Sequence, residues 1–306
     1  MKPLVSVLIN NYNYATYLPE AIESVLAQTY PHIEMIVVDD GSTDASHDII
    51  KAYQEKYPQR IVVHCKANGG QASAFNAGVA LAKGEVVCFL DSDDAFEPQK
   101  VEEVVKAYEQ GYVYMFNNHT MVFENNATKS HESIRFPYNG DNLFLVYYIS
   151  KYVGDITSTL SLSKALAMKI FPIVDEQGWR IQADDVIVFS ASMLERAYFI
   201  PQPLTRYRIH GTNGYYNKII PEDKKYARLK RIGVVKKRAV EILGLDEAFF
   251  HNTFNLVQEF KTHEHYDNEL LKLYTRVLFL EMRIPFLKKV LAYKEVVQHY
   301  LKERKK

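Results

Sequence analysis

Three carboxylates follow directly on an apolar run in the first third of the chain. Val86–Leu90 is hydrophobic, and Asp91, Asp93 and Asp94 occupy three of the next four positions. If the run is a buried strand, the three charges meet at its carboxyl end and repel one another. Hard oxygen ligands suit Mg²⁺ or Mn²⁺ and leave coordination positions free for phosphate oxygens. The pattern therefore predicts a divalent cation and a diphosphate at this edge of a sheet, where α/β proteins bind ligands.

An acidic helix start is the alternative interpretation of the same segment. Asp94 is suited to cap a helix that begins near Pro98, because an N-cap carboxylate accepts hydrogen bonds from the first backbone amides. Capping uses one carboxylate, whereas this segment has three. We therefore favour metal and diphosphate binding for the cluster.

Polar side chains also follow two other apolar runs. Asp39 and Asp40 end one of them, and Asn68 precedes two glycines after the next, with Asn76 further along. The carboxyl ends of parallel strands lie along one edge of a sheet, so we expect these residues beside the acidic cluster. Together they are suited to bind a nucleotide.

The elements that position these residues alternate through the first hundred positions. The predicted strands are Leu4–Ile9, Ile33–Val38, Ile61–Cys65 and Val86–Leu90. Between them, apolar residues recur at helical spacing over about 18–26, 44–56 and 73–82. Strand–helix alternation with short links indicates an α/β fold with a mainly parallel sheet covered by helices on both faces.

The remainder of the chain is less regular. Residues 112–117 and 121–124 are predicted strands, arranged as a hairpin, and 125–142 is predicted as a polar loop. Helical spacing returns near 143–149, 164–170 and 185–194. Three further helices are predicted at about 222–243, 246–263 and 267–304, the last of them interrupted at Pro285.

Charge divides the chain into two parts. Residues 1–217 carry 17 Lys and Arg against 25 Asp and Glu, whereas residues 218–306 carry 20 against 12. We therefore predict an acidic first domain, 1–217, and a basic helical C-terminal region, 218–306.

The composition also indicates the cellular compartment. Cys65 and Cys88 lie in predicted strands, and we expect them to be small buried residues in a reducing environment. Leu4–Ile9 is only strand length, so we expect no secretory signal. No apolar run approaches the roughly 18 uncharged residues of a membrane span. The expectation is a cytoplasmic protein.

The motifs occur in an order and spacing that resemble the family-2 inverting glycosyltransferases with a GT-A fold. The matching segments are VSVLINNYN (5–13), VDDGSTD (38–44), NGGQASAFNAG (68–78), GEV (84–86) and FLDSDD (89–94). The resemblance covers about residues 3–215 and does not reach the basic tail. It implies a nucleotide-diphospho-sugar transferase fold, with residues 1–217 as the catalytic domain.

The resemblance implies a role for each matching residue on the donor side. Asp39 is expected to accept a hydrogen bond from the base, typically uracil, in a pocket lined by the backbone of Asn11 and Tyr12. Asn68 and Asn76 are expected to contact the same nucleotide-sugar.

The same resemblance assigns the acidic cluster and the base. Asp91 is expected to contact the ribose or donor sugar, and Asp93 to coordinate the metal that bridges the diphosphate. An inverting transfer also needs a base that takes the acceptor proton, and the family places it in a Glu-Asp pair at the head of a helix. Here the pair is Asp184 and Asp185. Asp185 matches the family's Asp and is the predicted base. Asp184 replaces the Glu, so it also remains a candidate. The alternative is a pair without a catalytic role, placed at a helix N-terminus because the helix macrodipole favours negative charge there.

A second segment resembles the family's Tyr-Arg-x-His motif. Within it, His210 is expected to help ligate the metal and Arg208 to pair with the diphosphate, although an exposed basic turn is the alternative. Many relatives have Arg where this chain has Phe75, so Lys66 is a candidate for the missing phosphate contact. Trp179 is a candidate for stacking on an acceptor sugar, or else a core residue.

The basic tail allows two interpretations. Lysines and arginines between 224 and 238 are interleaved with apolar residues, and the pattern recurs over 278–291. One interpretation is peripheral contact with an anionic membrane, which would suit a lipid-linked acceptor. The other, which we favour because Glu222, Glu241, Glu281 and Glu295 dilute the positive face, is a helical appendage packed on the catalytic domain or on a second copy of the chain. No positive groove is expected in the acidic first domain, which argues against nucleic-acid binding.

These observations predict a Mn²⁺- or Mg²⁺-dependent inverting glycosyltransferase. It would move a sugar from a nucleotide donor, with UDP the expected nucleotide, to a hydroxyl of a glycan or lipid-linked acceptor in cell-surface polysaccharide synthesis. A non-catalytic nucleotide-sugar or glycan binding protein on the same scaffold is the alternative. A sugar nucleotidyltransferase or a dinucleotide-dependent dehydrogenase needs a Gly-rich loop after the first strand, where this chain has Asn10-Asn11-Tyr12-Asn13.

Overall fold

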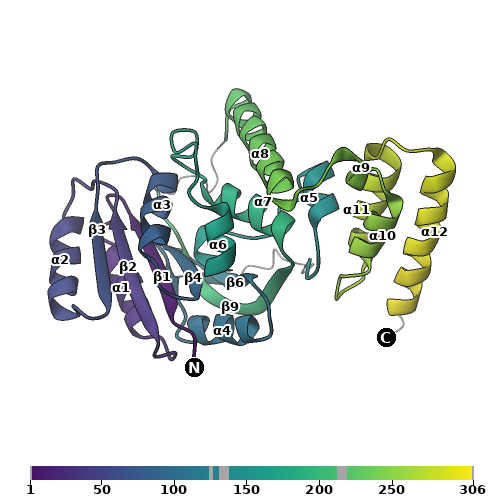
Figure 1. Cartoon of the computed structure of the whole chain (residues 1–306). Helices are drawn as coiled ribbons and strands as arrows, with labels where there is room; N and C mark the ends of the chain where they lie inside the picture. The colour runs from purple at the N-terminus through teal and green to yellow at the C-terminus, as the bar shows by residue number, and fades with distance from the viewer. Residues whose placement is uncertain (1, 124–126, 131–137, 212–218, 305–306) are drawn as a thin grey trace.

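A computed structural model describes residues 2–123, 127–130, 138–211 and 219–304 of the chain. Within these ranges, nine strands form one mixed sheet in the order β3-β2-β1-β4-β8-β6-β9-β5, with β7 paired to β6 (Figure 1). The strands are β1 (Val5–Asn11), β2 (Ile33–Asp39), β3 (Ile61–Cys65), β4 (Val86–Asp91), β5 (Ala95–Phe96), β6 (Tyr114–Phe123), β7 (Thr128–Ser130), β8 (Leu160–Ser163) and β9 (Ala197–Ile209). The expected α/β sheet with flanking helices and a C-terminal helical appendage is confirmed.

Helices cover both faces of the sheet because its central strands are apolar on both sides. One face carries α1 (Leu18–Leu26), α2 (Ser46–Lys56) and α4 (Lys100–Glu109); the other carries α3 (Gln71–Leu81), α6 (Lys164–Ile170) and α7 (Asp184–Leu194). Along β1, Val7 and Ile9 pack into the core on the side of α1, α2 and α4, and Leu8 packs into the core on the side of α3, α6 and α7. This alternation fixes the register of the strand, since a shift by one residue would exchange the two faces.

The register of the parallel strands gathers polar residues at one edge. β3, β2, β1 and β4 run parallel, and in this register Asn11 lies opposite Asp39 and Asn10 opposite Asp91. The ends of β1, β2 and β4 are therefore side by side, as the sequence predicts.

The expected hairpin between residues 112 and 124 is wrong. A single strand, β6, spans Tyr114–Phe123 and runs parallel to β9, with register shifts around Asn117 and Asn118. The polar residues that suggest a turn lie inside the sheet instead. Buried Asn117 donates a 3.0 Å hydrogen bond to Thr205 Oγ1 and accepts one from Lys100 Nζ. Buried polar groups of this kind need partners, and here the partners come from distant elements.

The two cysteines differ in their surroundings. Cys88 is buried, as expected, but Cys65 ends β3 and is exposed, with its Sγ 3.7 Å from His47 Nδ1. Among the helices that the structure describes, none has the length and apolar character needed to traverse a bilayer.

The C-terminal region is helical and begins with a long helix against α7. Its elements are α8 (Glu222–Leu243), α9 (Glu247–Phe250), α10 (Thr253–Phe260), α11 (Asn268–Arg276), η2 (Val277–Glu281) and α12 (Phe286–Glu303). The predicted helix 222–243 and the break at Pro285 are confirmed, whereas the predicted helix 246–263 is divided at Asn252. The predicted domain boundary between residues 217 and 218 lies outside the described residues.

The last helices share a core with α5 (Leu143–Ile149), which joins them to the sheet domain (Figure 1). At this junction, Glu259 accepts hydrogen bonds from the Phe144 N–H at 2.9 Å and the Tyr274 hydroxyl at 2.7 Å. Burial raises the pKa of Glu259 to about 8, so the carboxyl is protonated at neutral pH. Burial also lowers the pKa of His263, which contacts the same tyrosine, to about 3.

Glu259 should make the stability of this junction pH-dependent. Its folded pKa of about 8 exceeds the ordinary 4.5. Its contribution is therefore fully present below about 4.5 and declines as the pH rises to about 8, because the unfolded chain loses the proton first. Glu259→Gln, which cannot ionise, should flatten this decline. Urea unfolding from about pH 5 to about pH 8 measures it, with Glu269→Gln at the exposed start of α11 as control; equal slopes in wild type and Glu259→Gln would contradict the assignment.

Candidate active site

A cavity of about 680 Å³ opens where the parallel strands end. Its walls come from the loops after β1, β2, β3 and β4, from η1 (Thr157–Thr159), from the segment that leads into α7, and from β9. The polar residues that line it are Asn10, Asn11, Tyr12, Tyr14, Asp40, Asn68, Gln71, Asp91, Ser92, Asp93, Thr157, Arg180, Gln182, Asp184 and Tyr207. This is the edge that the sequence predicts for ligand binding.

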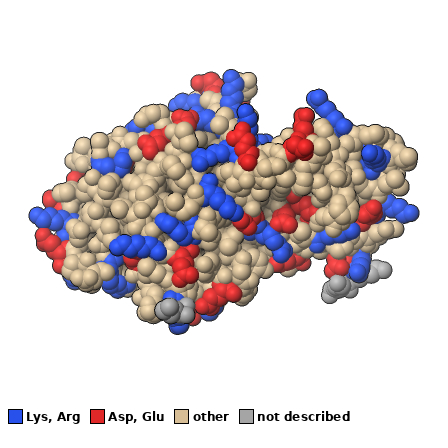
Figure 2. Space-filling view, in the orientation of Figure 1, with Lys and Arg blue, Asp and Glu red and all other residues tan. Residues whose placement is uncertain are grey.

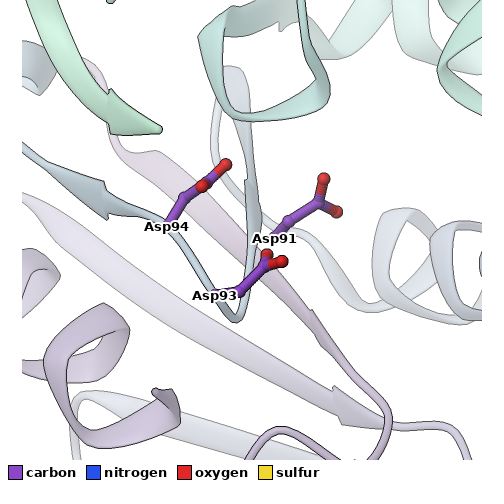
Figure 3. A group of neighbouring side chains, drawn as sticks. All are labelled: Asp91, Asp93 and Asp94. Atoms are coloured by element: carbon purple, nitrogen blue, oxygen red, sulfur yellow. The ribbon is translucent and has the colours of Figure 1, made fainter. Parts of the chain in front are cut away.

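The acidic cluster forms around the turn after β4 (Figure 3). One ligand oxygen from each of Asp91, Asp93 and Asp94 lies within 4.8 Å of the others. Burial, and then the charge of Asp93, raises the pKa of Asp91 to about 6. Burial and the two neighbouring carboxylates raise the pKa of Asp94 well above its usual range. The cluster therefore has a deficit of positive charge, which a divalent cation would supply.

Asp94 is held by the protein and does not cap a helix. Its carboxylate accepts hydrogen bonds from the Ser158 hydroxyl at 2.6 Å and from the Arg208 N–H at 2.9 Å. The next helix, α4, begins at Lys100 after Gln99, so the helix-cap alternative is wrong. Asp91 and Asp93, by contrast, both line the cavity.

The structure brings His210 to the acidic cluster. Its Nε2 lies 3.0 Å from Asp93 Oδ2, and its buried ring packs against Tyr14 and Tyr17. Asp91 and Asp93 line the cavity and the His210 imidazole lies beside Asp93, and carboxylate and imidazole donors of this kind suit Mn²⁺ and accommodate Mg²⁺. The residues present thus fit the expected metal.

Arg208 anchors the β9 end rather than lining the cavity. Its Nε donates to the Asp93 carbonyl at 3.1 Å, and its guanidinium pairs with Glu20 over the ring of Tyr17. These contacts fix the turn that carries Asp93. The expected pairing of Arg208 with a diphosphate stays a prediction, since Arg208 is not among the residues that line the cavity.

Two adjacent aspartates at the end of β2 have different surroundings. Asp39 is buried and accepts hydrogen bonds from Asn11 Nδ2 at 2.7 Å and Ser42 Oγ at 2.6 Å, so it shapes the wall formed by Asn11 and Tyr12. Asp40 lines the cavity and accepts the Gly70 N–H at 2.6 Å and Lys66 Nζ at 2.7 Å. Lys66, the candidate for a phosphate contact, is therefore paired with a carboxylate.

The two asparagines of the 68–78 segment lie in different places. Asn68 lines the cavity, donates to the Asp40 carbonyl at 3.0 Å and accepts from Arg180. Asn76 lies outside it: its amide bonds the backbone of Ile173 at 2.7 and 2.9 Å and Glu176 Oε1 at 2.8 Å. Its position on α3 turns it toward the loop before α7, where it has a positioning role.

The two carboxylates at the start of α7 also face different surroundings. Asp184 lines the cavity, and burial, together with the charges of Asp185 and Asp91, raises its pKa to about 7. Asp185 faces α8 instead, where its two oxygens accept Nε and Nη2 of Arg228 at 2.6 and 2.7 Å. Burial raises the pKa of Asp185, and the Arg228 guanidinium limits the rise.

Trp179 belongs to the core. Only 3% of its surface is exposed, and the Arg231 guanidinium lies 4.9 Å from its ring centroid. This placement does not provide a stacking surface for an acceptor sugar. The neighbouring Arg180 is exposed and lines the cavity. It packs over Gly70 (φ +89°), where a Cβ would lie 2.5 Å from the Arg180 Cα.

Three residues in or next to the site are not identified by the sequence motifs. Gln71 accepts the Ala183 N–H at 2.8 Å and reaches Thr157 at 3.3 Å, so it ties the α7 start to the nucleotide side. Arg180 contributes a cation to the cavity wall, and its only sequence signal is its place just before the aspartate pair. Arg228 looks like one of many charges in the basic run, and the sequence does not distinguish it.

Comparison with known proteins gives consistent matches. The family model described as glycosyl transferase family 2 matches residues 6–167. The uncharacterized glycosyltransferase alr2836 of Nostoc is 41% identical over 214 residues, which cover 69% of this chain and 66% of that protein. The putative teichuronic acid biosynthesis glycosyltransferase TuaG of Bacillus subtilis is 42% identical over 123 residues, 40% of this chain and 48% of TuaG. The matches thus span no more than about two thirds of these relatives.

Solved structures agree in fold. S. aureus TarS 1–349 in complex with UDP superposes with a TM-score of 0.61 and 19% sequence identity, covering 97% of this chain and 89% of that one. The same protein in complex with UDP-GlcNAc gives a TM-score of 0.57 at 18% identity, over 97% of this chain and 89% of that one. At this identity the likeness shows the fold.

Proposed function

Since the chain belongs to glycosyl transferase family 2, we propose that it moves a sugar from a nucleotide donor to a hydroxyl of a glycan or lipid-linked acceptor, with inversion. The observation that carries the proposal is one cavity lined by two different acidic sites. Asp91 and Asp93 lie on the β4 turn, and Asp184 lies on the α7 start. A direct displacement needs both a centre that stabilises the leaving group and a separate base.

The donor is a UDP-sugar in this proposal. The solved complexes of TarS with UDP and UDP-GlcNAc support that choice, as does the wall built by Asn11, Tyr12 and Asp39. Asn11 and Tyr12 contact the base, and Asp39 holds their wall in place. Asp91 contacts the ribose or donor sugar.

Asp93, His210 and Asp91 would hold Mn²⁺ or Mg²⁺. The bound cation supplies positive charge to the diphosphate leaving group, whose negative charge grows as the glycosidic bond breaks. Ser158 and the Arg208 backbone fix Asp94, and Asp94 in turn fixes the turn that presents Asp93.

Asp184 is the base in this proposal, in place of Asp185. It faces the cavity, and its pKa of about 7 suits a group that must take a proton near neutral pH. Asp185 is engaged by Arg228 and keeps the α7 start in position. The acceptor hydroxyl would approach on the α7 side, where Arg180 and Gln182 line the wall.

The relatives suggest a setting for the reaction. TuaG is described as a putative teichuronic acid biosynthesis enzyme. We therefore propose a growing cell-surface polysaccharide as the acceptor class.

Ligand-induced stabilisation tests the donor proposal. UDP with Mn²⁺ should raise the melting temperature, because a ligand at about 100 times its Kd stabilises the folded state by about 2.7 kcal/mol. GDP with Mn²⁺ is the matched control and should give a smaller rise. Incubation with UDP-sugars and Mn²⁺ should then release UDP slowly; binding without any release would favour the non-catalytic alternative.

A further inference from the structure

The end of the molecule formed by η2 and α12 exposes a group of large apolar side chains. Leu280 is 76% exposed, Phe286 71%, Leu287 69% and Leu291 57%, and Val290 is also exposed. Isolated exposed apolar residues are common, but a group of this size in adjacent turns indicates a surface that contacts something.

Four of these residues lie on one side of α12, and Leu280 belongs to the preceding η2. Leu287, Val290, Leu291 and Lys294 follow the i, i+3, i+4, i+7 spacing of a single helix face. The opposite face buries Ala292, Val296 and Tyr300 against α10 and α11. The helix therefore has one apolar face for its own core and a second for an external contact.

Basic side chains border the exposed face. Arg283, Lys288 and Lys294 are exposed basic residues there, whereas Lys289 donates to the Phe279 carbonyl at 3.0 Å. The acidic residue that follows, Glu295, lies 3.9 Å from Lys261. The nearest acidic residue before this segment, Glu281, faces Arg276 at 3.4 Å. Figure 2 shows Lys and Arg side chains, mostly uncharged surface and a few Asp and Glu side chains at the end of the molecule that α12 occupies in Figure 1.

We propose that this face, the η2–α12 surface (Leu280, Arg283, Phe286–Lys288, Val290, Leu291 and Lys294), docks on an anionic lipid bilayer. Interfacial helices combine Phe and Leu on one side with flanking Lys and Arg, and the basic groups are attracted to anionic headgroups. A symmetric dimer through the same face would set these basic residues against their own copies, and lysine is depleted in the centre of protein interfaces. The charge therefore selects lipid over a second copy of the chain.

The basic run on α8 is less suited to this role. Lys236 Nζ donates to the Tyr147 carbonyl and to Ser150 Oγ at 2.9 Å each, and Arg228 and Arg231 face Asp185 and Trp179. Part of the run is thus used to join α8 to the sheet domain. The inference concerns docking alone and is independent of the proposed reaction.

Vesicle flotation of the full chain tests the proposal. The protein should float with phosphatidylcholine vesicles that contain phosphatidylglycerol, and at least about tenfold less with phosphatidylcholine alone. Leu287→Glu combined with Leu291→Glu should reduce the anionic partition coefficient at least about tenfold. The matched control, Leu229→Glu with Val234→Glu, changes two exposed apolar residues of α8 and should float like wild type. Lys288→Glu should weaken binding about fivefold, or more because the charge is reversed.

Several outcomes would overturn the docking proposal. Wild-type chain that stays in the dense fraction with anionic vesicles would do so without any variant. Equal flotation of the Leu287/Leu291 variant and wild type would do the same. Light scattering that finds a wild-type dimer and a monomeric Leu287/Leu291 variant would assign the face to a second copy of the chain.

Discussion

Asp93→Asn should slow metal-dependent turnover of the donor by about 10²–10³-fold or more. The substitution keeps the shape of the side chain but removes the charge that faces His210 across 3.0 Å in the cavity wall. Without it, the cluster loses a ligand next to the point where the leaving diphosphate would lie. Calorimetric titration with Mn²⁺, with and without UDP, measures the binding defect, and UDP release measures turnover.

Asp94→Asn is the matched control for this prediction. Asp94 belongs to the same cluster, but its two oxygens accept hydrogen bonds from Ser158 and the Arg208 backbone. The control should retain most metal uptake and lose about 1–3 kcal/mol of stability, the cost of disturbing buried hydrogen bonds. Unchanged Mn²⁺ uptake in Asp93→Asn would remove Asp93 from the metal site.

The sequence predicts the parallel half of the fold and most of the donor side because both depend on local patterns. Apolar runs that end in polar residues locate the strand ends, and parallel strands place those ends at one edge. Asn11, Asp91 and Asp93 therefore line one cavity in the structure. His210 contacts Asp93 although it lies more than a hundred residues later, and the family motif anticipates this neighbourhood.

The rest depends on long-range packing that local pattern does not contain. Asn117 looks like a turn residue but is satisfied inside the sheet by Lys100 and Thr205. Asn76 matches a motif position, yet its helix directs it toward Ile173, outside the cavity. Arg228 resembles its basic neighbours until the packing of α8 on α7 sets it against Asp185. Each case turns on which distant element supplies the partner of a polar side chain.

The second large effect concerns the carboxylate pair of α7. Asp184→Asn should slow transfer by about 10²–10⁴-fold while leaving UDP-sugar binding nearly unchanged, because the amide cannot accept the acceptor proton. Wild-type transfer should rise with pH through about 7, the pKa of Asp184, since the base acts only when it is ionised. Single-turnover rates as a function of pH, alongside donor affinity by titration, separate these two effects.

Asp185→Asn makes the same chemical change one residue further along and should behave differently. It breaks the two hydrogen bonds with Arg228, so the free energy of unfolding should fall. The loss should be smaller than the roughly 3–5 kcal/mol expected for a fully buried pair, because the Arg228 side chain is 33% exposed. Transfer should fall less than in Asp184→Asn, since Asp184 remains, and its pH midpoint should move below about 7, because the charge of Asp185 helps to raise the pKa of Asp184. Arg228→Lys, which retains the charge without the paired geometry, should shift transfer in the same direction by a smaller factor. If Asp185→Asn loses transfer while Asp184→Asn retains it, the base is Asp185, and Arg228 must leave that carboxylate before the acceptor can react.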